Sequence, residues 1–281
     1  MRSILITGSS SGFGMHVAVA LAERGWQVFA SMRDTAKRDR LDRLAESSGV
    51  TDRIEVVQLD VASSESREKG VRQVLEACGD RLDAVLHNAG YTTLGFFEDL
   101  SPEQCRRLVE TNLFGAMEVT RLVLPAMRAR RRGRIALVTS NAVNVPHPLF
   151  SVYAATKWAL EGWAEALAVE LAPFGLDVVI LQPGTHDTDF AGNVAPVLPE
   201  GSAYGELFNR AMPRLTRIGA YSRSTTKAEA EMCEVLQARR PRLRTRIGPD
   251  DKVAAWLARI APYRVRERAV EWITGLKPAR R

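Results

Sequence analysis

Short apolar runs alternate along this chain with longer stretches of helical periodicity. The runs occupy residues 3–7, 27–30, 54–59, 84–87, 135–139, 177–181 and 243–247 and are rich in Val, Ile and Leu. Runs of this kind are typical of parallel strands buried on both faces. The stretches between them repeat apolar residues every three or four positions, as in Val17, Ala20 and Leu21. Strand alternating with helix predicts right-handed crossovers and a doubly wound α/β sheet.

Three regions depart from that simple alternation. The helical stretches at 102–130 and 152–172 are long, which would suit a helix-to-helix interface in a homodimer or homotetramer. After Pro183-Gly184 the regular pattern lapses until about Thr226, and long irregular stretches in compact domains are usually functional. We therefore expect a substrate loop or lid at about 185–225. A helix opened by Pro249 and a basic extension at about 240–281 close the chain.

The composition favours one globular domain spanning residues 1–281. A chain of 281 residues with 46% hydrophobic residues can bury one large core. The apolar run before Gly8 is too short for a signal peptide, and no run reaches the roughly 18 apolar residues of a transmembrane segment. Three widely spaced cysteines indicate neither a disulfide framework nor a metal site. We expect a cytoplasmic protein without a bound metal.

The net charge of +6 belongs to the C-terminal segment. Residues 235–281 hold thirteen Lys or Arg against four Asp or Glu. Such a segment can be a solvated face, a binding area for an anionic substrate carrier, or a patch that binds nucleic acid or a membrane surface. We favour the solvated face, because apolar residues interrupt the charges. No nucleic-acid-binding motif accompanies them, so no nucleic-acid partner is expected.

A glycine-rich turn follows the first expected strand. It reads Thr7-Gly8-Ser9-Ser10-Ser11-Gly12-Phe13-Gly14 and leads into a helical pattern. Glycines let the backbone approach a pyrophosphate, and the N–H groups of a helix start bind its charge. The spacing differs from the common G-x-G-x-x-G fingerprint, and a bare turn is the alternative. We predict a dinucleotide site built from Gly8, Ser9, Ser10, Gly12, Phe13 and Gly14.

The end of the second strand indicates which dinucleotide binds. Met32 stands where an acid would select NAD, and Arg33 follows with a planar charged fork suited to the 2′-phosphate of NADP. Asp34 is the contrary evidence, because it can reach a ribose or pair with Arg33. NADP(H) is therefore predicted, with NAD(H) the less favoured cofactor. Asp60 and Val61, after the third strand, are predicted to bind adenine, although Asp60 is almost equally suited to the start of a helix.

A tyrosine and a lysine form the candidate reaction centre. Tyr153 and Lys157 are four residues apart at the start of a helical stretch, so they share one face. Ser140, at the end of the fifth strand, precedes Tyr153 by thirteen positions. An adjacent ammonium favours the phenolate, which brings the pKa of a tyrosine closer to the range of a general base. We expect Lys157 to act on Tyr153 in this way.

With these motifs the sequence resembles the short-chain dehydrogenase/reductase family. The matching residues are Thr7 to Gly14, Asn88-Ala89-Gly90, Asn112, the Ser140, Tyr153 and Lys157 spacing, and Pro183-Gly184 with Thr188 beyond. The match covers about residues 1–190. Met32-Arg33-Asp34, residues 159–162 and residues 241–248 look like the branch that contains 17β-hydroxysteroid and retinol dehydrogenases. Thr156 stands where the family more often has Ser.

The resemblance implies a Rossmann-type fold with about seven strands in the order 3-2-1-4-5-6-7. It also implies that Lys157 bonds the nicotinamide ribose, Ser140 donates to the substrate oxygen and Asn112 holds a water. Thr188 would hold the carboxamide, and Tyr153 would supply a proton while hydride leaves the nicotinamide. The cofactor contacts would include Asn88, Ala89, Gly90, Tyr153, Lys157, Pro183 and Gly184.

The expected substrate is a small lipophilic ketone or alcohol, free or bound to a carrier. Residues 91–97, 141–150 and the loop from 185 onward are predicted to line its cavity. The contacts that we single out are Phe96, Ser140, Asn141, Leu149 and Tyr153, and Phe97 is among the aromatic residues expected there. His147 and His186 are assigned to the structure of the substrate loops. A catalytically silent NADP(H)-binding sensor or scaffold is the rival interpretation, but all four catalytic residues are present.

Overall fold

Seven parallel strands form one sheet in this computed structural model, which describes residues 1–145, 147–184, 196–220, 225–248, 252, 256 and 260–276. The strands are β1 (Ser3–Thr7), β2 (Gln27–Met32), β3 (Ile54–Gln58), β4 (Ala84–His87), β5 (Gly133–Val138), β6 (Leu176–Pro183) and β7 (Arg244–Ile247). Their order is β3-β2-β1-β4-β5-β6-β7, which confirms the predicted Rossmann-type topology. Every neighbouring pair is parallel, with Ile4 opposite both Val28 and Ala84.

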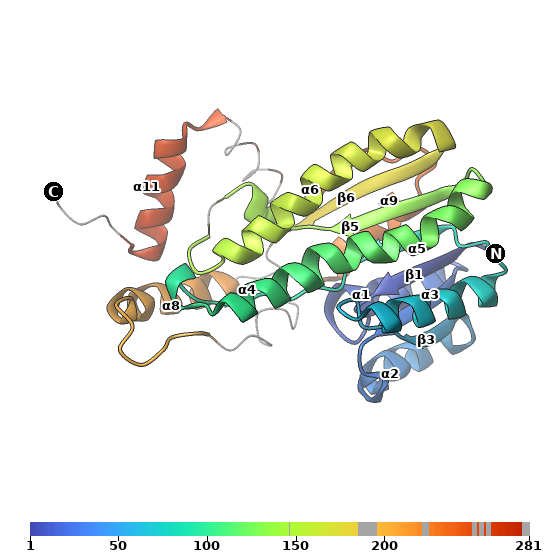
Figure 1. The fold of residues 1–281 in the computed structure, drawn as a ribbon, viewed down its shortest axis with the longest axis horizontal. Coiled ribbons are helices and arrows are strands. Elements are labelled where there is room, and N and C mark those ends of the chain that lie inside the picture. The colour runs from blue at the N-terminus through green and yellow to red at the C-terminus, as the bar shows by residue number, and fades with distance from the viewer. Residues whose placement is uncertain are drawn as a thin grey trace.

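Helices cover both faces of this sheet (Figure 1). One face carries α1 (Gly12–Glu23), α2 (Asp39–Ser47) and α9 (Thr225–Gln237). The other carries α3 (Ser64–Cys78), α4 (Pro102–Val109), α5 (Gly115–Ala129) and α6 (Ser151–Leu171). All residues of β1 and β5 are buried, because side chains on both faces of these strands pack against helices. The apolar runs of the sequence are therefore the central strands.

The long stretch at 102–130 is not one uniform helix. A π-helical turn, η4 (Glu110–Phe114), separates α4 from α5. Such turns are rare and often lie at functional sites. Asn112 sits within this turn and is 1% exposed, and its side chain bonds the backbone of Tyr91 instead of facing solvent. The π-turn thus aims Asn112 at the loop that follows β4.

The region expected to be irregular, at about 185–225, contains a helix. The prediction that this region lacks regular structure is therefore wrong. Helix α8 (Gly205–Ala220) lies within 185–225 and packs through Phe208, Met212 and Leu215 on Leu94 and Leu149. Pro213 and Gly205 obscured its periodicity in the sequence, but tertiary packing of its apolar face outweighs their low helix propensity. Residues 185–195, including Thr188 and His186, lie outside the described residues, as does the start of the helix expected at Pro249.

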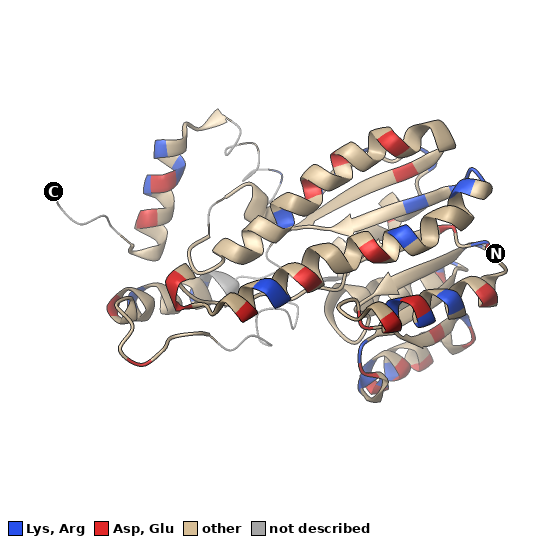
Figure 2. Ribbon diagram, in the orientation of Figure 1, with Lys and Arg blue, Asp and Glu red and all other residues tan. Residues whose placement is uncertain are grey.

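The C-terminal part adds α11 (Tyr263–Thr274), which contacts α8. Figure 2 shows charges of both signs on α11, where Arg264, Arg266 and Arg268 are interspersed with Glu267 and Glu271. Shorter 3-10 turns complete the described elements: η1 (Thr35–Lys37), η2 (Thr51–Arg53), η3 (Phe97–Asp99), η5 (Asn141–Val143) and η6 (Ala172–Phe174). Among the described residues, no helix is both long and apolar enough to span a membrane.

Candidate active site

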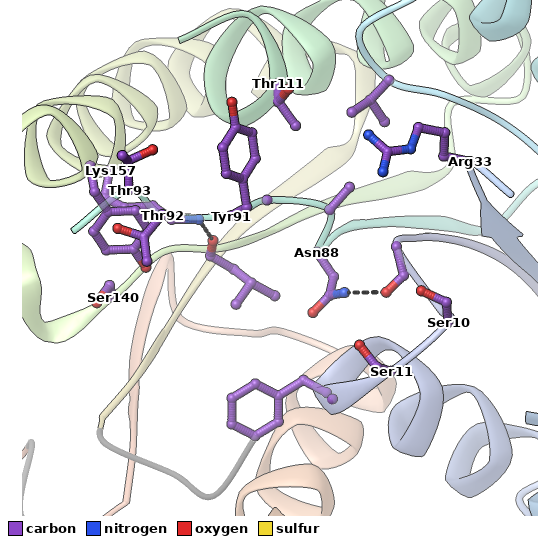
Figure 3. Close-up of a pocket in the computed structure, with 18 of the residues that line it drawn as sticks. Ser10, Ser11, Arg33, Asn88, Tyr91, Thr92, Thr93, Thr111, Ser140 and Lys157 are labelled. Atoms are coloured by element: carbon purple, nitrogen blue, oxygen red, sulfur yellow. Dashed lines mark hydrogen bonds between the residues drawn. The ribbon is translucent and has the colours of Figure 1, made fainter. Parts of the chain in front are cut away.

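A cleft of about 1570 Å³ opens at the carboxyl ends of the strands. The loops after β1 to β6 all contribute to its wall, as expected where the strand order of a doubly wound sheet reverses. Figure 3 shows Ser10, Ser11 and Arg33 at one end and Ser140, Lys157, Thr92 and Thr93 at the other. The predicted phosphate and reaction sites therefore belong to one continuous cavity.

The start of α1 is prepared for an anion. Its N-cap, Ser11, is extended and makes no side-chain capping bond, and no acid lies in the first turn. The first N–H groups of the helix are therefore not capped by Ser11 and are favourable to negative charge. Gly8 has a φ of 72°, and a Cβ there would come within 2.8 Å of the Cα of Ala89. Only glycine lets these two loops meet so closely.

Two predicted cofactor residues have other roles. Ser9 is fully buried and does not line the cleft, since its hydroxyl donates to the carbonyl of Ile6 at 3.0 Å. The prediction that Ser9 donates to a phosphate is therefore wrong. Gly14 is buried inside α1, where a Cβ would clash with the carbonyl oxygen of Gly8 and lie 2.5 Å from Asn88 Nδ2. Gly14 lets the helix pack against the turn and is no cleft residue.

Cations gather on the cleft wall beyond β2. Arg33 lines the cleft as predicted, and three further basic residues join it, namely Lys37, Arg40 and Arg43. These three were not expected from the sequence, because they lie on the η1–α2 segment, which has to fold back over the end of the sheet. Asp39 is the acid among them. Met32 also lines this end, leaving an apolar floor where an NAD-selecting carboxylate would stand.

Asp34 has a structural role. Its Oδ1 accepts a hydrogen bond from the N–H of Ala36 at 3.1 Å and caps η1, and Asp34 does not line the cleft. Asp60 and Val61 do line it. Oδ1 of Asp60 accepts from the N–H of Ala62 at 3.0 Å, so this carboxylate also organises its own loop. The N-cap of α3 is Ser63, not Asp60.

The loop after β4 is bonded firmly to the glycine-rich turn. Asn88 Nδ2 donates to the carbonyl oxygen of Gly8 at 2.9 Å (Figure 3) and to that of Thr7 at 3.1 Å. Thr7 Oγ1 in turn accepts from the N–H groups of Asn88 and Ala89. Asn88, Ala89 and Gly90 all line the cleft, as do Pro183 and Gly184 after β6.

Tyr153 and Lys157 lie side by side on α6, at the opposite end of the cleft from the cations. Both are buried, at 6% and 4% exposure, and both line the cavity. Lys157 Nζ lies 5.6 Å from the centre of the Tyr153 ring and donates to the carbonyl of Val138 at 2.8 Å. Ser140 lines the same end, and its Oγ accepts from the N–H of Ala142.

Burial controls the protonation of this pair. It raises the pKa of Tyr153 to about 12, although a hydrogen bond with Ser140 acts in the opposite direction. Burial also lowers the pKa of Lys157 to about 8. Desolvation of the phenolate is the largest cause of the raised pKa of Tyr153, and Lys157 is not among the groups that lower it, so the expected lowering by Lys157 is not seen here. A protonated phenol at neutral pH is suited to giving a proton to an oxygen.

Asn112 connects this end to the loop after β4. Its Oδ1 accepts from the N–H of Tyr91 at 3.0 Å, and its Nδ2 donates to the Tyr91 carbonyl at 2.8 Å. Nδ2 also lies 3.3 Å from Thr156 Oγ1, on the helix that carries Tyr153 and Lys157. A Cβ at Gly90 would come within 3.2 Å of Asn112 Oδ1 and 3.7 Å of Lys157 Nζ. All four predicted catalytic residues thus converge.

Only some of the predicted substrate contacts line the cleft. Ser140, Asn141 and Tyr153 do. Leu149 instead packs in a buried cluster with Leu94 and Phe208, and Phe96 stacks on Tyr204 at 4.5 Å between ring centres. Phe97 is 68% exposed. Leu149 and Phe96 therefore pack behind the cleft wall, because α8 and the segment before it cover them.

Other residues form the wall at this end. They are Thr92, Thr93, Leu94, Ala142, His147, Phe150, Pro196, Val197 and Leu215. Val197 donates its N–H to the carbonyl of Leu94 at 2.7 Å, which joins the segment after residue 195 to the loop after β4. Burial lowers the pKa of His147, whose Nδ1 bonds the Val145 carbonyl. No group of metal-ligating side chains occurs among the described residues.

Comparisons with known proteins agree with this geometry. Residues 2–197 match the family model described as short chain dehydrogenase. The chain is 32% identical to 3-ketodihydrosphingosine reductase of Bacteroides thetaiotaomicron, over 88% of this chain and 87% of that protein. It is 39% identical to retinol dehydrogenase 8 of Homo sapiens, over 69% of this chain but only 61% of that protein.

Solved structures give the same assignment. A short-chain dehydrogenase from Streptomyces avermitilis superposes with a TM-score of 0.81 at 32% identity, covering 96% of this chain and 95% of that one. An actinorhodin polyketide ketoreductase solved with NADPH has a TM-score of 0.69 at 29% identity, covering 90% and 92%. Sequence, topology and site geometry thus agree, and the chain belongs to the short-chain dehydrogenase/reductase family of oxidoreductases.

Proposed function

We propose that this protein is an NADP(H)-dependent oxidoreductase that interconverts a carbonyl and an alcohol on a lipophilic substrate, with Tyr153 as the general acid/base. The observation that carries the proposal is one cleft with Tyr153, Ser140 and Lys157 at one end and a cation cluster at the other. A dinucleotide spanning these ends supplies hydride at the tyrosine end when bound. No observation favours the catalytically silent alternative.

Each residue has a role that its surroundings support. Tyr153 is buried and protonated at neutral pH, so it gives a proton to a carbonyl oxygen as hydride arrives at the carbon. Ser140 borders the same space and donates to that oxygen. Lys157 lines the cleft beside Tyr153 and bonds the ribose hydroxyls. Thr188, outside the described residues, stays a predicted carboxamide contact.

The decisive experiment is reduction of a panel of apolar ketones and aldehydes with NADPH. We expect turnover by the parent, and a loss of at least about 100-fold in kcat for Tyr153→Phe, because general acid catalysis contributes about 10²–10⁴-fold. Dissociation constants for NADPH, measured by fluorescence, should agree within a few-fold between the two proteins. A Tyr153→Phe variant that turns over at the parental rate would remove Tyr153 from the mechanism.

The cation cluster supports NADP over NAD. Arg33, Lys37, Arg40 and Arg43 share one wall, and Asp34 caps η1 away from the cleft. We expect Arg33→Ala to reduce the preference for NADPH over NADH by about 10–100-fold, which is the effect of losing a charged hydrogen bond. Asp34→Ser is the matched control, since it retains a capping side chain and should leave the preference within about twofold. Equal kcat/KM for NADPH and NADH in the parent would contradict the assignment.

The substrate end supports a lipophilic molecule. Leu94, Phe150, Val197 and Leu215 make its wall mainly apolar, and transfer of apolar surface into such a site is favourable. The names of two relatives, a 3-ketodihydrosphingosine reductase and a retinol dehydrogenase, fit the same chemistry. A substrate bound to a carrier is the alternative form of the same proposal.

An assembly of identical chains is part of the proposal. Trp158 and Val169 lie on one exposed face of α6, three turns apart, at 59% and 75% exposure. Gly162 lies between them, and a Cβ there would meet no atom within 4 Å. Glu165 lies on the same face, so this stripe is apolar at Trp158 and Val169, carries one half-exposed carboxylate and has an open centre at Gly162, which suits close packing of a second helix.

A further inference from the structure

A buried carboxylate lies directly behind the reaction centre. Glu161 is on α6, four residues after Lys157 and eight after Tyr153, so the three side chains share a face. It is 5% exposed and does not line the cleft. Burying a charge is costly unless it is paired and hydrogen-bonded. The hydrogen bonds of Glu161 offset the cost of burying its carboxylate.

Both oxygens of this carboxylate are bonded. Oε1 accepts from Thr139 Oγ1 at 2.8 Å and from Gln182 Nε2 at 2.6 Å. Oε2 accepts from Arg244 Nε at 3.0 Å, and Arg244 Nη2 forms the ion pair at 2.8 Å. Glu161 on α6 therefore bonds β6, β7 and the residue that follows β5.

The partners of Glu161 adjoin the residues that form the site. Thr139 immediately precedes Ser140, and Gln182 immediately precedes Pro183-Gly184. Lys157 donates to the carbonyl of Val138, next to Thr139. Helix α6 is thus bonded at two successive residues of the β5 end, once through Lys157 and once through Glu161. Arg244 starts β7 and pairs with Ile180 on β6.

We propose that Glu161, paired with Arg244, is a positioning residue that sets Ser140 against Tyr153 and sets the Pro183-Gly184 backbone at the cofactor end of the cleft. Glu161 accepts three hydrogen bonds and forms an ion pair with Arg244, and these directed contacts fix the helix along its axis and about it. Apolar packing alone is less directional. The effect of Glu161 on catalysis rests on the proposed function. If the reacting groups are displaced by about 1 Å, the rate can fall by about 100-fold.

The test compares three variants. Glu161→Gln keeps the shape but weakens the bonds to Arg244. Thr139→Val removes the bond beside Ser140, together with the weaker bond of the same hydroxyl to the Leu181 carbonyl at 3.4 Å, and leaves the bonds to Gln182 and Arg244. Glu165→Gln is the matched control, since Glu165 also bonds Arg244, at 2.7 Å, from the same helix, but its side chain is about half exposed. All three are measured as full-length proteins well below their melting temperatures.

The first measurement needs no turnover. Hydrogen exchange followed by mass spectrometry should show faster exchange at residues 139–144 and 182–184 in Glu161→Gln, and at 139–144 in Thr139→Val. Glu165→Gln should match the parent at both places. Unchanged exchange at residues 139–144 in both Glu161→Gln and Thr139→Val would overturn the proposal, whether or not the protein is an active reductase.

The second measurement concerns hydride transfer. We expect kcat to fall about 10–100-fold in Glu161→Gln, with KM for the carbonyl substrate within about threefold. The deuterium isotope effect on kcat with NADPH labelled at the transferred position should rise, because a misaligned chemical step becomes more rate-limiting. A loss of activity that follows only the folded fraction, with an unchanged isotope effect, would contradict positioning. A parent without any turnover would instead count against the proposed function.

Discussion

At Lys157 and Tyr153, burial acts on two groups of opposite charge type. It lowers the pKa of the lysine to about 8 and raises that of the tyrosine to about 12, since the charged form of each is disfavoured away from water. Both residues are therefore closer to neutrality than in solution. The site favours the protonated form of Tyr153. Keeping Lys157 charged as an ammonium in the same buried place costs folding free energy.

That cost predicts a pH-dependent stability. The pKa of Lys157 falls from 10.5 in the unfolded reference to about 8 in the folded protein. Between these values the unfolded chain binds more protons, so this residue's contribution to the free energy of unfolding rises with pH. Tyr153 acts in the opposite direction, but only above its ordinary pKa of 10.

The measurement is thermal unfolding of the parent and of Lys157→Met at about pH 7.5 and about pH 9.5. We expect the melting temperature of the parent to rise relative to that of Lys157→Met between the two conditions. Lys69→Met, at a residue on the exposed side of α3, controls for the general effect of losing a lysine. If the melting temperature of the parent falls relative to that of Lys157→Met as pH rises, the predicted direction of the effect is wrong.

Among the elements, α9 ends against a buried arginine. Arg134 of β5 donates to the carbonyl oxygens of Val235, Leu236 and Ala238 at 2.5 to 3.0 Å and forms an ion pair with Asp177. The last carbonyls of a helix lack partners within it, and they carry partial negative charge. A guanidinium satisfies several of them together and joins α9 to the sheet.

Arg134→Met should therefore lower the free energy of unfolding by about 2–4 kcal/mol, because buried carbonyls lose their donor. Urea unfolding at neutral pH measures it. Arg2→Met is the control, since Arg2 reaches the Gln237 carbonyl of the same helix end at 3.5 Å from an exposed position. That variant should lose less than about 1 kcal/mol. Equal losses in the two variants would mean that burial of Arg134 does not matter.

For the whole molecule, the proposed assembly follows from the exposed α6 stripe of Trp158, Gly162 and Val169. We expect light scattering after gel filtration to give two or four times the 31.1 kDa of one chain. Trp158→Glu combined with Val169→Glu should shift the protein toward one chain, because buried charges without partners are unfavourable at an interface.

Trp272→Ser is the matched control for that experiment. Trp272 is 78% exposed on α11, away from α6 in Figure 1, so its replacement should leave the mass unchanged. A parent protein that already elutes as a single chain would contradict the assembly, and so would a mass that only Trp272→Ser changes.

Much of this molecule was predictable from the sequence. All seven strands were expected within three residues of their observed limits, because runs buried on both faces are apolar throughout. The association of Ser140, Tyr153 and Lys157 was expected from their spacing, and that of Asn112 from the resemblance to the family. Helix α8 was not expected, since Pro213 and Gly205 hide its periodicity and its packing partners are distant in the sequence.

The sequence by itself determined the alternating α/β order, the glycine-rich turn and the tyrosine–lysine pair, because periodicity and spacing are local properties of a chain. Only the tertiary structure decided which side chains face the cleft. It turned Ser9 and Gly14 inward, brought Lys37, Arg40 and Arg43 beside Arg33, and set α8 over Leu149. It also decided the protonation of Tyr153, because desolvation depends on everything packed around a group, and that packing joins segments far apart in the sequence.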